Sequence, residues 1–333
     1  MRKLGFIILG ALVCLTLVII AVLVFYPPYA DKQRNPITAH SPYIISSQAQ
    51  TLHNSLIIGD LHGDALLWPR NLNKRNSRGH IDIPRLIEGN VTLQVFTAVT
   101  KVPFKKNYKN NSANSFDNIK LLAILSAWPL RTWDSLLERA LHQLDKLKTF
   151  EKKSKGKLSI MRTKTDLEKI ILRKKNGESV VGGLFGVEGG HAFEGKIENL
   201  ENLYSKGLRV VGLHHFFDNE LGGSLHGEGR GGLTKFGLEV IKFVGEKGMV
   251  LDLAHSSEAV VKEALDSIDF PVIISHTGVH SHTPSSRNID DKLLLRIARG
   301  GGLIGVGFWP QVIGDDHSPK GIAKVIIHAA KRF

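Results

Sequence analysis

Two short apolar runs, Met249-Val-Leu-Asp-Leu-Ala-His255 and Pro271-Val-Ile-Ile-Ser-His276, each stop at a histidine. Their length and composition predict two strands. Residues 257–268, between them, have the apolar spacing of an amphipathic helix. A strand, a helix and a strand in succession form a parallel crossover, which places both histidines at the same carboxyl edge of the sheet. Imidazoles side by side at such an edge are suited to hold a metal ion.

The same alternation of strands and helices extends over most of the chain. Further strand-like runs lie at residues 56–60, 91–99, 179–187, 208–213 and 303–308. Alternating strands and helices predict a parallel sheet. Seven strands followed by a helix predict a (β/α)8 barrel of the TIM type that lacks its eighth strand because the chain ends early. We therefore expect a C-terminally incomplete barrel over residues 51–333, with a doubly wound open sheet as the alternative.

The N-terminal segment has the features of a membrane anchor. Residues 4–26 contain no charge and are long enough to span a bilayer as one helix. Arg2 and Lys3 precede them and Pro27-Pro28 follow, so we expect an anchor over residues 1–28. The apolar run is longer than that of a cleavable signal and no clear cleavage site follows it. We expect an uncleaved single-pass anchor, a polar linker over residues 29–50, and a body outside the cytoplasm, periplasmic or extracellular.

Composition restricts the partners and the chemistry of the body. The formal net charge is +13, and much of it lies in runs at residues 101–109, 146–157 and 162–175. We expect these runs to be solvated helix faces and loops. No recognition module accompanies them, so nucleic acid is not expected as a partner. The only cysteine, Cys14, lies in the anchor, so the body has no disulfide, thiolate ligand or cysteine nucleophile.

Residues that can bind metal follow several of the predicted strands. His62 and Asp64 are two residues apart on an extended segment, so their side chains point the same way. Glu188 follows the third strand in Gly186-Val-Glu-Gly-Gly190, where the glycines permit close approach of the backbone. With the two strand-end histidines described above, the candidate metal ligands are His62, Asp64, Glu188, His255 and His276.

This donor set indicates a particular class of metal site. Carboxylates and imidazoles that converge on one rim are ligands for zinc or another borderline divalent ion. Five ligands that include a glutamate suit two metals that share a bridging carboxylate and a bridging water. His214 and His215 follow the fourth strand and point in opposite directions, so only one of them can face the rim. The remaining histidines of interest fall on loops, where we expect them to face solvent or shape the loop: His191, His226, His280 and His282.

Four groups of residues have a more specific pattern. They are Gly59-Asp-Leu-His-Gly-Asp-Ala-Leu66, Gly186-Val-Glu-Gly-Gly-His191, Asp252-Leu-Ala-His255, and Ser275-His276 followed by Ser286-Arg287-Asn288. Together they resemble the membrane (renal) dipeptidase family of the amidohydrolase superfamily, from about residue 56 to the end of the chain. The resemblance implies a (β/α)8 barrel with two zinc ions, which hydrolyses the peptide bond of dipeptides with a metal-activated hydroxide.

The resemblance also implies a metal role for each ligand. His62 and Asp64 would bind one zinc ion, and His255 and His276 the other. Glu188 would bridge the two ions. Such a pair of metals acidifies the shared water and takes up charge as the tetrahedral intermediate forms.

Two further residues match positions that bind substrate in this family. His215 matches the histidine that contacts the scissile carbonyl, and its sequence context favours it over His214. Arg287 matches the arginine that holds the terminal carboxylate of the substrate. A guanidinium can bind a free carboxylate with two hydrogen bonds, which selects short substrates with a free C-terminus. The alternative for Arg287 is a salt bridge within its loop.

One expected feature of the family is absent from the sequence. The family carries an aspartate at the end of the eighth strand, in a Gly-Asp-x-Asp-Gly type of segment, that handles proton transfer. This chain ends at Phe333, on the helix that should precede that strand, so we expect a fragment or a truncated reading frame of a longer enzyme. Two alternative functions stay open: a metallohydrolase acting on another amide, a lactone or a β-lactam, and a non-catalytic membrane-tethered metal-binding protein. Homodimer formation also stays open.

Overall fold

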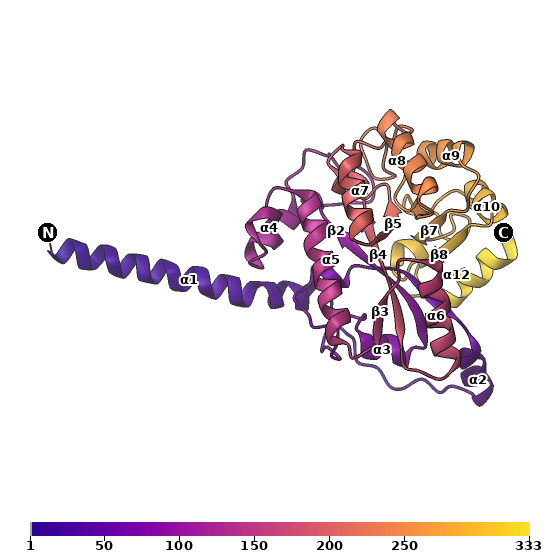
Figure 1. The fold of residues 1–333 in the computed structure, drawn as a ribbon, viewed down its shortest axis with the longest axis horizontal. Helices are drawn as coiled ribbons and strands as arrows, with labels where there is room; N and C mark the ends of the chain where they lie inside the picture. The colour runs from indigo at the N-terminus through magenta and orange to yellow at the C-terminus, as the bar shows by residue number, and fades with distance from the viewer. Residues whose placement is uncertain (1) are drawn as a thin grey trace.

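The computed structural model describes residues 2–333 and shows a parallel sheet surrounded by helices, from which one long helix projects (Figure 1). Its strands are β1 (Ile58–Gly63), β2 (Val91–Val99), β3 (Leu158–Ile160), β4 (Val181–Glu188), β5 (Leu208–Gly212), β6 (Val250–Asp252), β7 (Ile273–Thr277) and β8 (Leu303–Val306).

Helices connect and flank these strands. They are α1 (Arg2–Arg34), α2 (Ser47–Ser55), α3 (Ile83–Glu88), α4 (Asn118–Leu125), α5 (Leu136–Lys153), α6 (Lys164–Lys175), α7 (Ile197–Lys206), α8 (Lys235–Glu246), α9 (Glu258–Ser267), α10 (Asp291–Arg299), α11 (Pro310–Ile313) and α12 (Pro319–Arg332). Short 3-10 turns are η1 (Ala65–Leu67), η2 (Leu130–Thr132) and η3 (Gly190–Phe193). Several starts are fixed by side-chain caps: Ser135, Thr163 and Ser257 each accept a hydrogen bond from a main-chain N–H in the first turn of α5, α6 and α9.

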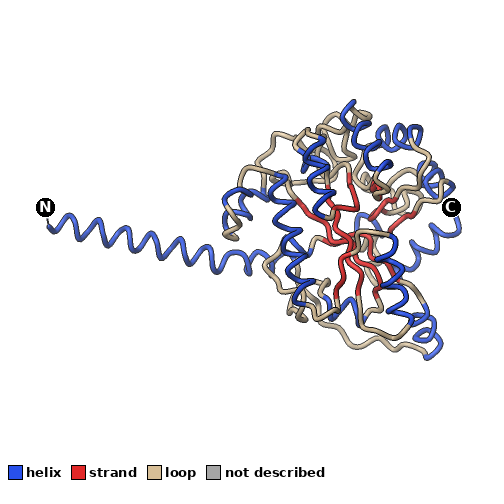
Figure 2. Tube along the Cα trace, viewed as in Figure 1, coloured by secondary structure: helices blue, strands red, loops and turns tan. Residues whose placement is uncertain are grey.

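The sheet curls into a nearly closed barrel. Its strands pair in parallel in the order β1-β2-β4-β5-β6-β7-β8, with β3 beside β4. The curl of the sheet brings β1 into contact with β7, although the two strands are far apart in this order. Helices cover the outside of the barrel (Figure 2). The predicted α/β barrel class is therefore confirmed, and the open doubly wound alternative is wrong. Because all the paired strands run the same way, their carboxyl ends gather at one rim.

Buried apolar side chains from the strands and helices fill one large core. Phe96, Phe185, Val211, Leu251 and Ile274 come from five strands and are inaccessible to solvent. Most residues of these strands are buried whichever face they point to, as expected for parallel strands covered on both faces. A rigid barrel wall of this kind holds the residues at its rim in fixed positions.

Two elements differ from the sequence-based expectations. The strand β3 was not predicted, because three residues between two helices carry too little periodic signal. The expected end of the first helix at Pro27-Pro28 is wrong, since α1 continues through both prolines to Arg34. Proline inside a helix removes a backbone hydrogen bond. Here the last turns of α1 are held by the body, where Asp31 is fully buried and ion-paired with Arg78.

Among the described residues, α1 is the one helix long and apolar enough to cross a membrane. Its most apolar window has a mean hydropathy of 3.3, and none of that window is buried inside the protein. Figure 1 shows that this part of α1 extends away from the barrel without touching it. The segment therefore has the length, composition and exposure of a membrane anchor or a signal sequence.

Candidate metal centre and active site

The barrel rim gathers all five candidate ligands at one place. His62 lies on β1, Glu188 is the last residue of β4, and His276 lies on β7. Asp64 directly follows β1, and His255 comes three residues after β6. Because these strands are parallel neighbours or come together through the curl of the sheet, their carboxyl ends share one face of the barrel.

Glu188 is at the centre of the group. Its Oε1 lies 3.4 Å from Nε2 of His62, 3.2 Å from Nε2 of His255 and 3.4 Å from Nε2 of His276. Its Oε2 lies 3.1 Å from Nε2 of His215. One carboxylate thus faces imidazole nitrogens from four separate segments of the chain.

A second carboxylate completes one side of the group. Oδ1 of Asp64 lies 3.3 Å from Nε2 of His62 and accepts a hydrogen bond from the hydroxyl of Thr97 at 2.6 Å. On the other side, the hydroxyl of Ser275 lies 2.7 Å from Nδ1 of His276, which leaves Nε2 directed toward Glu188. Hydrogen bonds of this kind fix the orientation of metal ligands.

The donor set fits divalent metal ions. Potential ligand atoms of His62, Asp64 and Glu188 lie within 4.8 Å of one another, and so do those of Glu188, His215 and His255. Oε2 of Glu188 is buried and, although Nε2 of His215 lies 3.1 Å away, makes no hydrogen bond to the described residues. A buried carboxylate that lacks a donor is costly unless a cation is present. The site therefore has the composition of a divalent-metal centre.

The pKa values of the buried carboxylate and imidazole groups also indicate that this site suits a bound cation. Burial, together with the neighbouring Asp64 carboxylate, raises the pKa of Glu188 to about 8. Burial lowers the pKa values of His255 and His276 far below the usual range, so both rings are neutral with free lone pairs. Burial alone would also lower the pKa of His62, but Asp64 and Glu188 outweigh it and raise this pKa to about 9. His255 and His276 are thus already in the neutral form that binds metal, whereas His62 and Glu188 hold a proton in the absence of a cation and must release it when a metal binds.

The backbone at His255 is strained. Its φ angle is +63°, in the left-handed region that residues with a side chain rarely adopt. The ring of His255 lies close to the rings of His215 and His276. Its centroid is 5.0 Å from the centroid of each. Backbone strain of this kind persists only where the surrounding structure holds the residue in place, and it occurs most often at functional sites.

The two histidines after β5 have different surroundings, as predicted. His215 faces Glu188, whereas Nδ1 of His214 lies 3.0 Å from the hydroxyl of Ser256 on the opposite side. Burial lowers the pKa of both rings, that of His214 to about 4. His215 is therefore the member of the pair that can contact a molecule in the site.

Arg287 is fully buried beside the ligands and has an unsatisfied guanidinium. Its Nη2 donates to the main-chain carbonyl of His276 and lies 3.3 Å from Nε2 of His255. Its Nε and Nη1 have no hydrogen-bond partner in the described residues, and its Cζ lies 5.5 Å from the centre of the Trp309 ring. Burial lowers its pKa to about 10, so the group stays charged at neutral pH. None of the carboxylates in the described chain pairs with it, so the alternative of a salt bridge within its loop is not supported.

Sequence reasoning missed one carboxylate at the site. Asp252 is the last residue of β6, and a carboxylate oxygen lies within 4.8 Å of ligand atoms of His62 and His276. Its Oδ1 accepts hydrogen bonds from the main-chain N–H groups of Ala254 and Ser275. From the sequence, Asp252 is only part of the Asp252-Leu-Ala-His255 motif and has no predicted role at the site. Its position three residues before a ligand histidine was the available signal.

Of the two expectations for the loop histidines, exposure to solvent is wrong for His191 and His226, which are both buried. His191 packs against Phe217 with ring centroids 4.8 Å apart, and burial lowers its pKa to about 3. His226 is stacked on Phe216, with ring centroids 5.2 Å apart, and burial lowers its pKa to about 3 as well. Long-range packing of these aromatic rings covers loops that local sequence suggested were open. His280 is exposed and His282 is half-buried, as expected.

A cavity of about 670 Å³ opens onto the site. The candidate ligands, His215 and Arg287 line it together with residues of α1, α4 and the 102–108 segment. This volume is in the range of pockets that hold small molecules.

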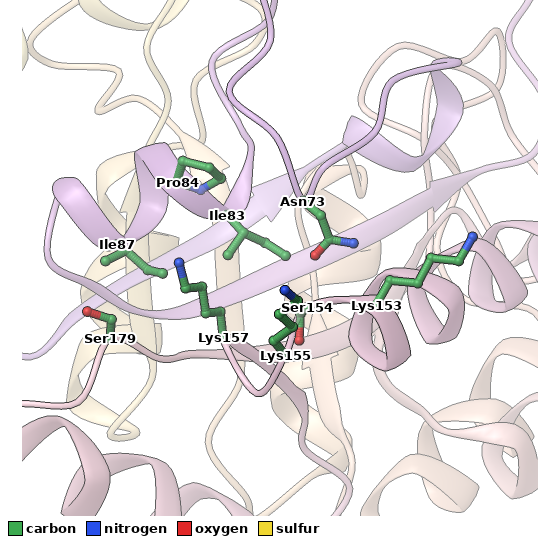
Figure 3. Close-up of a pocket in the computed structure, with 9 residues that line it drawn as sticks. All are labelled: Asn73, Ile83, Pro84, Ile87, Lys153, Ser154, Lys155, Lys157 and Ser179. Carbon is green, nitrogen blue, oxygen red and sulfur yellow. The ribbon is translucent and has the colours of Figure 1, made fainter.

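A second cavity, of about 390 Å³, lies between α3 and the segment that follows α5. Figure 3 shows Ile83 and Ile87 of α3 pointing toward Lys157 across it. The described residues that line it include no histidine and no carboxylate, so it takes no part in the metal centre.

Comparison with known proteins supports this geometry. A model of the membrane dipeptidase family, peptidase family M19, matches residues 46–333. Dipeptidase verJ of Clonostachys rogersoniana is 28% identical over 241 residues, which cover 72% of this chain and 56% of that protein. An uncharacterized dipeptidase of Schizosaccharomyces pombe is 28% identical over 238 residues, which cover 70% of this chain and 52% of that protein. The chain thus spans about half the length of these curated relatives.

A solved structure has the same fold. The metallo peptidase from Rhodobacter sphaeroides, crystallised with a phosphinate mimic of the dipeptide L-Ala-D-Ala, superposes with a TM-score of 0.64 and 21% identity. The match covers 83% of this chain and 82% of that one. Since the family model extends over nearly the whole described body and the barrel has the same architecture, the chain belongs to the membrane dipeptidase family, peptidase family M19.

Proposed function

We propose that the protein is a zinc-dependent dipeptidase with a binuclear metal centre. His62 and Asp64 would hold one zinc ion, His255 and His276 the other, and Glu188 would bridge them. The observation that carries the proposal is the position of Glu188, whose Oε1 lies within 3.4 Å of Nε2 of all three of these histidines. When bound, two zinc ions acidify a shared water and polarise the scissile carbonyl.

In this proposal His215 orients the substrate. Its Nε2 lies on the Oε2 side of Glu188, away from the other imidazoles around Oε1. From there the ring can donate a hydrogen bond to the carbonyl oxygen of the scissile peptide. A donor aimed at that oxygen stabilises the charge that develops on it as the bond is attacked. His214 cannot replace it, because its ring faces Ser256.

Arg287 would recognise the free C-terminus of the substrate. Two of its guanidinium nitrogens, Nε and Nη1, are buried without partners in the described chain. Cδ lies between Nε and Nη1, so a carboxylate would accept from Nη1 at the outer end of the group, where Nη2 also lies, which gives Nη1 a partner and fixes the orientation of the carboxylate. The distance from this arginine to the ligand His255 is only 3.3 Å, so a carboxylate bound there would place the preceding peptide bond at the metal centre. This favours dipeptides over longer chains.

We further propose that residues 1–28 anchor the chain in a membrane as a single span, with the barrel of residues 51–333 on the extracytoplasmic side, periplasmic or extracellular. Residues 29–50 would connect the two. The apolar, exposed window of α1 supports the anchor. Formation of a homodimer remains part of this proposal and is tested by the mass of the purified chain in detergent.

A dipeptide panel tests the proposed activity. The purified full chain, loaded with zinc, is assayed for release of free amino acids from L,L- and L,D-dipeptides and from the same dipeptides with an amidated C-terminus. We expect hydrolysis of the free dipeptides, loss of activity on chelation, recovery with zinc, and poor hydrolysis of the amides. Two bound metals without hydrolysis of any dipeptide would favour a non-catalytic metal-binding protein. Preference for lactones or β-lactams over dipeptides would contradict the proposed substrate class.

A further inference from the structure

The helix α1 is fixed to the body by a buried ionic cluster. The carboxylate of Asp31 is fully buried and lies 2.6 Å from Nε of Arg78 and 3.4 Å from Nε of Arg70. The side-chain amide of Asn35 donates to Oδ1 of Asp31, and the main-chain N–H of Gly79 donates to the carbonyl of Asn35. The end of α1 is therefore docked on the 70–79 segment rather than joined to the body by a free tether.

The apolar part of α1 and its docked end are adjacent. Residues 4–26 carry no charge, and Pro27 is already buried against the body. At 1.5 Å per residue, residues 4–26 extend over about 35 Å. The hydrocarbon core of a bilayer is about 30 Å thick, with a headgroup layer of roughly 5–7 Å on each side. If α1 spans the membrane, the body must begin within or directly above the headgroup layer.

Four large apolar side chains are exposed on the same side of the body. Phe104, Phe116, Leu121 and Leu130 have exposed fractions of 54%, 58%, 39% and 73%. The helix α4, which carries Leu121, contacts α1, and η2, which carries Leu130, contacts α4. Figure 1 shows α4 at the side of the body from which α1 projects. We refer to these four residues as the α4 apolar patch.

Basic residues surround the α4 apolar patch. Residues 101–131 contain six basic residues and one acidic residue, Asp117. Asp117 is already paired with Arg139, whereas Lys105, Lys106 and Lys109 are exposed. Aromatic and aliphatic side chains next to unpaired lysines form the type of surface that inserts into the interface of an anionic membrane. A solvated loop, which the sequence suggested for the 101–109 run, would not need the apolar side chains beside it.

We propose that the α4 apolar patch inserts into the headgroup layer of an anionic bilayer next to α1, with Lys105 and Lys109 against the lipid headgroups, so that the body lies against the membrane surface. This proposal rests on the membrane anchor proposed above and is independent of the chemistry of the metal centre. It has a consequence for access to the site. Tyr26, Ala30 and Arg34 of α1 line the same cavity as the metal ligands, so the cavity opens at the membrane surface.

Depth-dependent fluorescence quenching tests the contact. The full chain, with Cys14→Ser and one new cysteine, is labelled with an environment-sensitive fluorophore. It is then placed, one chain per disc, in nanodiscs of phosphatidylglycerol and phosphatidylcholine. The new cysteine is Phe116→Cys or Leu121→Cys in the patch. The matched controls are Leu172→Cys on α6 and Leu238→Cys on α8, which are 59% and 45% exposed. A lipid with a nitroxide near its headgroup is then added to the discs.

We expect probes at positions 116 and 121 to lose most of their emission to the nitroxide and to emit at shorter wavelength, while probes at 172 and 238 change little. Quenching at 116 and 121 should weaken in discs of phosphatidylcholine alone. Equal quenching at all four positions, or none at 116 and 121, would overturn the proposal. So would equal quenching at 116 and 121 in both lipid compositions, because it would show that the lysines do not select anionic lipid.

A probe on Cys14 of the natural sequence separates failure of the anchor from failure of the contact. A nitroxide at the centre of the lipid chains should quench this probe if α1 spans the bilayer. If the Cys14 probe is quenched while the probes at positions 116 and 121 are not, only the proposed surface contact is wrong. If the Cys14 probe is also unaffected, the anchor is wrong and the surface contact with it. Neither outcome depends on dipeptide hydrolysis.

Discussion

The Nε2 atoms of His255 and His276 lie 3.0 Å apart, on side chains from two neighbouring segments at the barrel rim. Burial holds the pKa values of both rings well below their usual range, so neither carries a positive charge at neutral pH. Two lone-pair-bearing nitrogens at this separation, with Oε1 of Glu188 within 3.4 Å of each, form a natural position for a cation. The crossover that joins β6 to β7 creates this relationship, because it places both strand ends at one edge.

Replacement of Arg287 with lysine tests recognition of the substrate carboxylate. Lysine keeps the charge but cannot present two parallel N–H groups to a carboxylate. Hydrogen bonds to charged groups contribute roughly 1.5–3 kcal/mol, so we expect kcat/KM for dipeptides to fall roughly 10- to 100-fold. The measurement is steady-state kinetics on dipeptides and on their amides. An equal loss on both substrates would show that Arg287 does not bind the carboxylate.

His215 and His214 form a matched pair of adjacent buried histidines. Loss of a hydrogen-bond donor to the reacting carbonyl typically lowers kcat by about 10²- to 10³-fold, and we expect this for His215→Ala. His214→Ala should leave kcat within a few-fold. It should instead lower the free energy of unfolding by about 1–3 kcal/mol, because the contact with Ser256 is lost and a buried space is left. Kinetics and thermal unfolding of the two variants separate these effects. A larger loss of kcat in His214→Ala would reverse the assignment.

Lys146 gives a prediction about pH that is independent of the metal centre. Burial, together with the charge of Arg70, lowers its pKa to about 8, and its Nζ donates to the carbonyl of Trp68. Because the folded pKa is below that of an unfolded lysine, about 10.4, the unfolded chain binds more protons between these values. The free energy of unfolding therefore gains a contribution that rises with pH from about 8 to 10.4. Denaturant titrations at several pH values should show this rise, and Lys146→Met should flatten it. The same pH dependence in both proteins would contradict the prediction.

The convergence of the candidate ligands was predictable because it depends on local pattern and on one rule of topology. His62, Glu188 and His276 each lie at or one residue before the end of a strand, and parallel strands in a barrel bring such ends together. No knowledge of side-chain packing was needed. For the same reason Asp252, also the last residue of a strand, could have been included.

The features that could not be predicted depend on contacts between distant segments. His226 is buried because Phe216 stacks on it, and nothing in its own loop indicates this. The helix α1 passes Pro28 because Asp31, one turn further on, reaches Arg78 in a different part of the chain. The local sequence predicted a loop around His226 and a helix end at Pro27-Pro28. Contacts with distant segments bury the first and extend the helix past the second.

Asp31→Ala tests the docking of α1. Removing one partner of a buried ion pair leaves the other charge without compensation, which typically costs about 3–5 kcal/mol. Arg70 is 5% exposed and would be left in this state, so we expect a marked fall in the unfolding temperature of the full chain in detergent. Lys32→Ala, at the adjacent exposed position, is the control and should change it little. Equal unfolding temperatures for the two variants would show that α1 is not held by this cluster.

Metal content and position test the binuclear centre most directly. A crystal of the zinc-loaded chain, measured at wavelengths on either side of the zinc absorption edge, should show two anomalous peaks. One peak should lie against His62 and Asp64, the other against His255 and His276, and both against the carboxylate of Glu188. Glu188→Ala should lose at least one of the two ions. A single peak, or two peaks that do not share Glu188, would contradict the account.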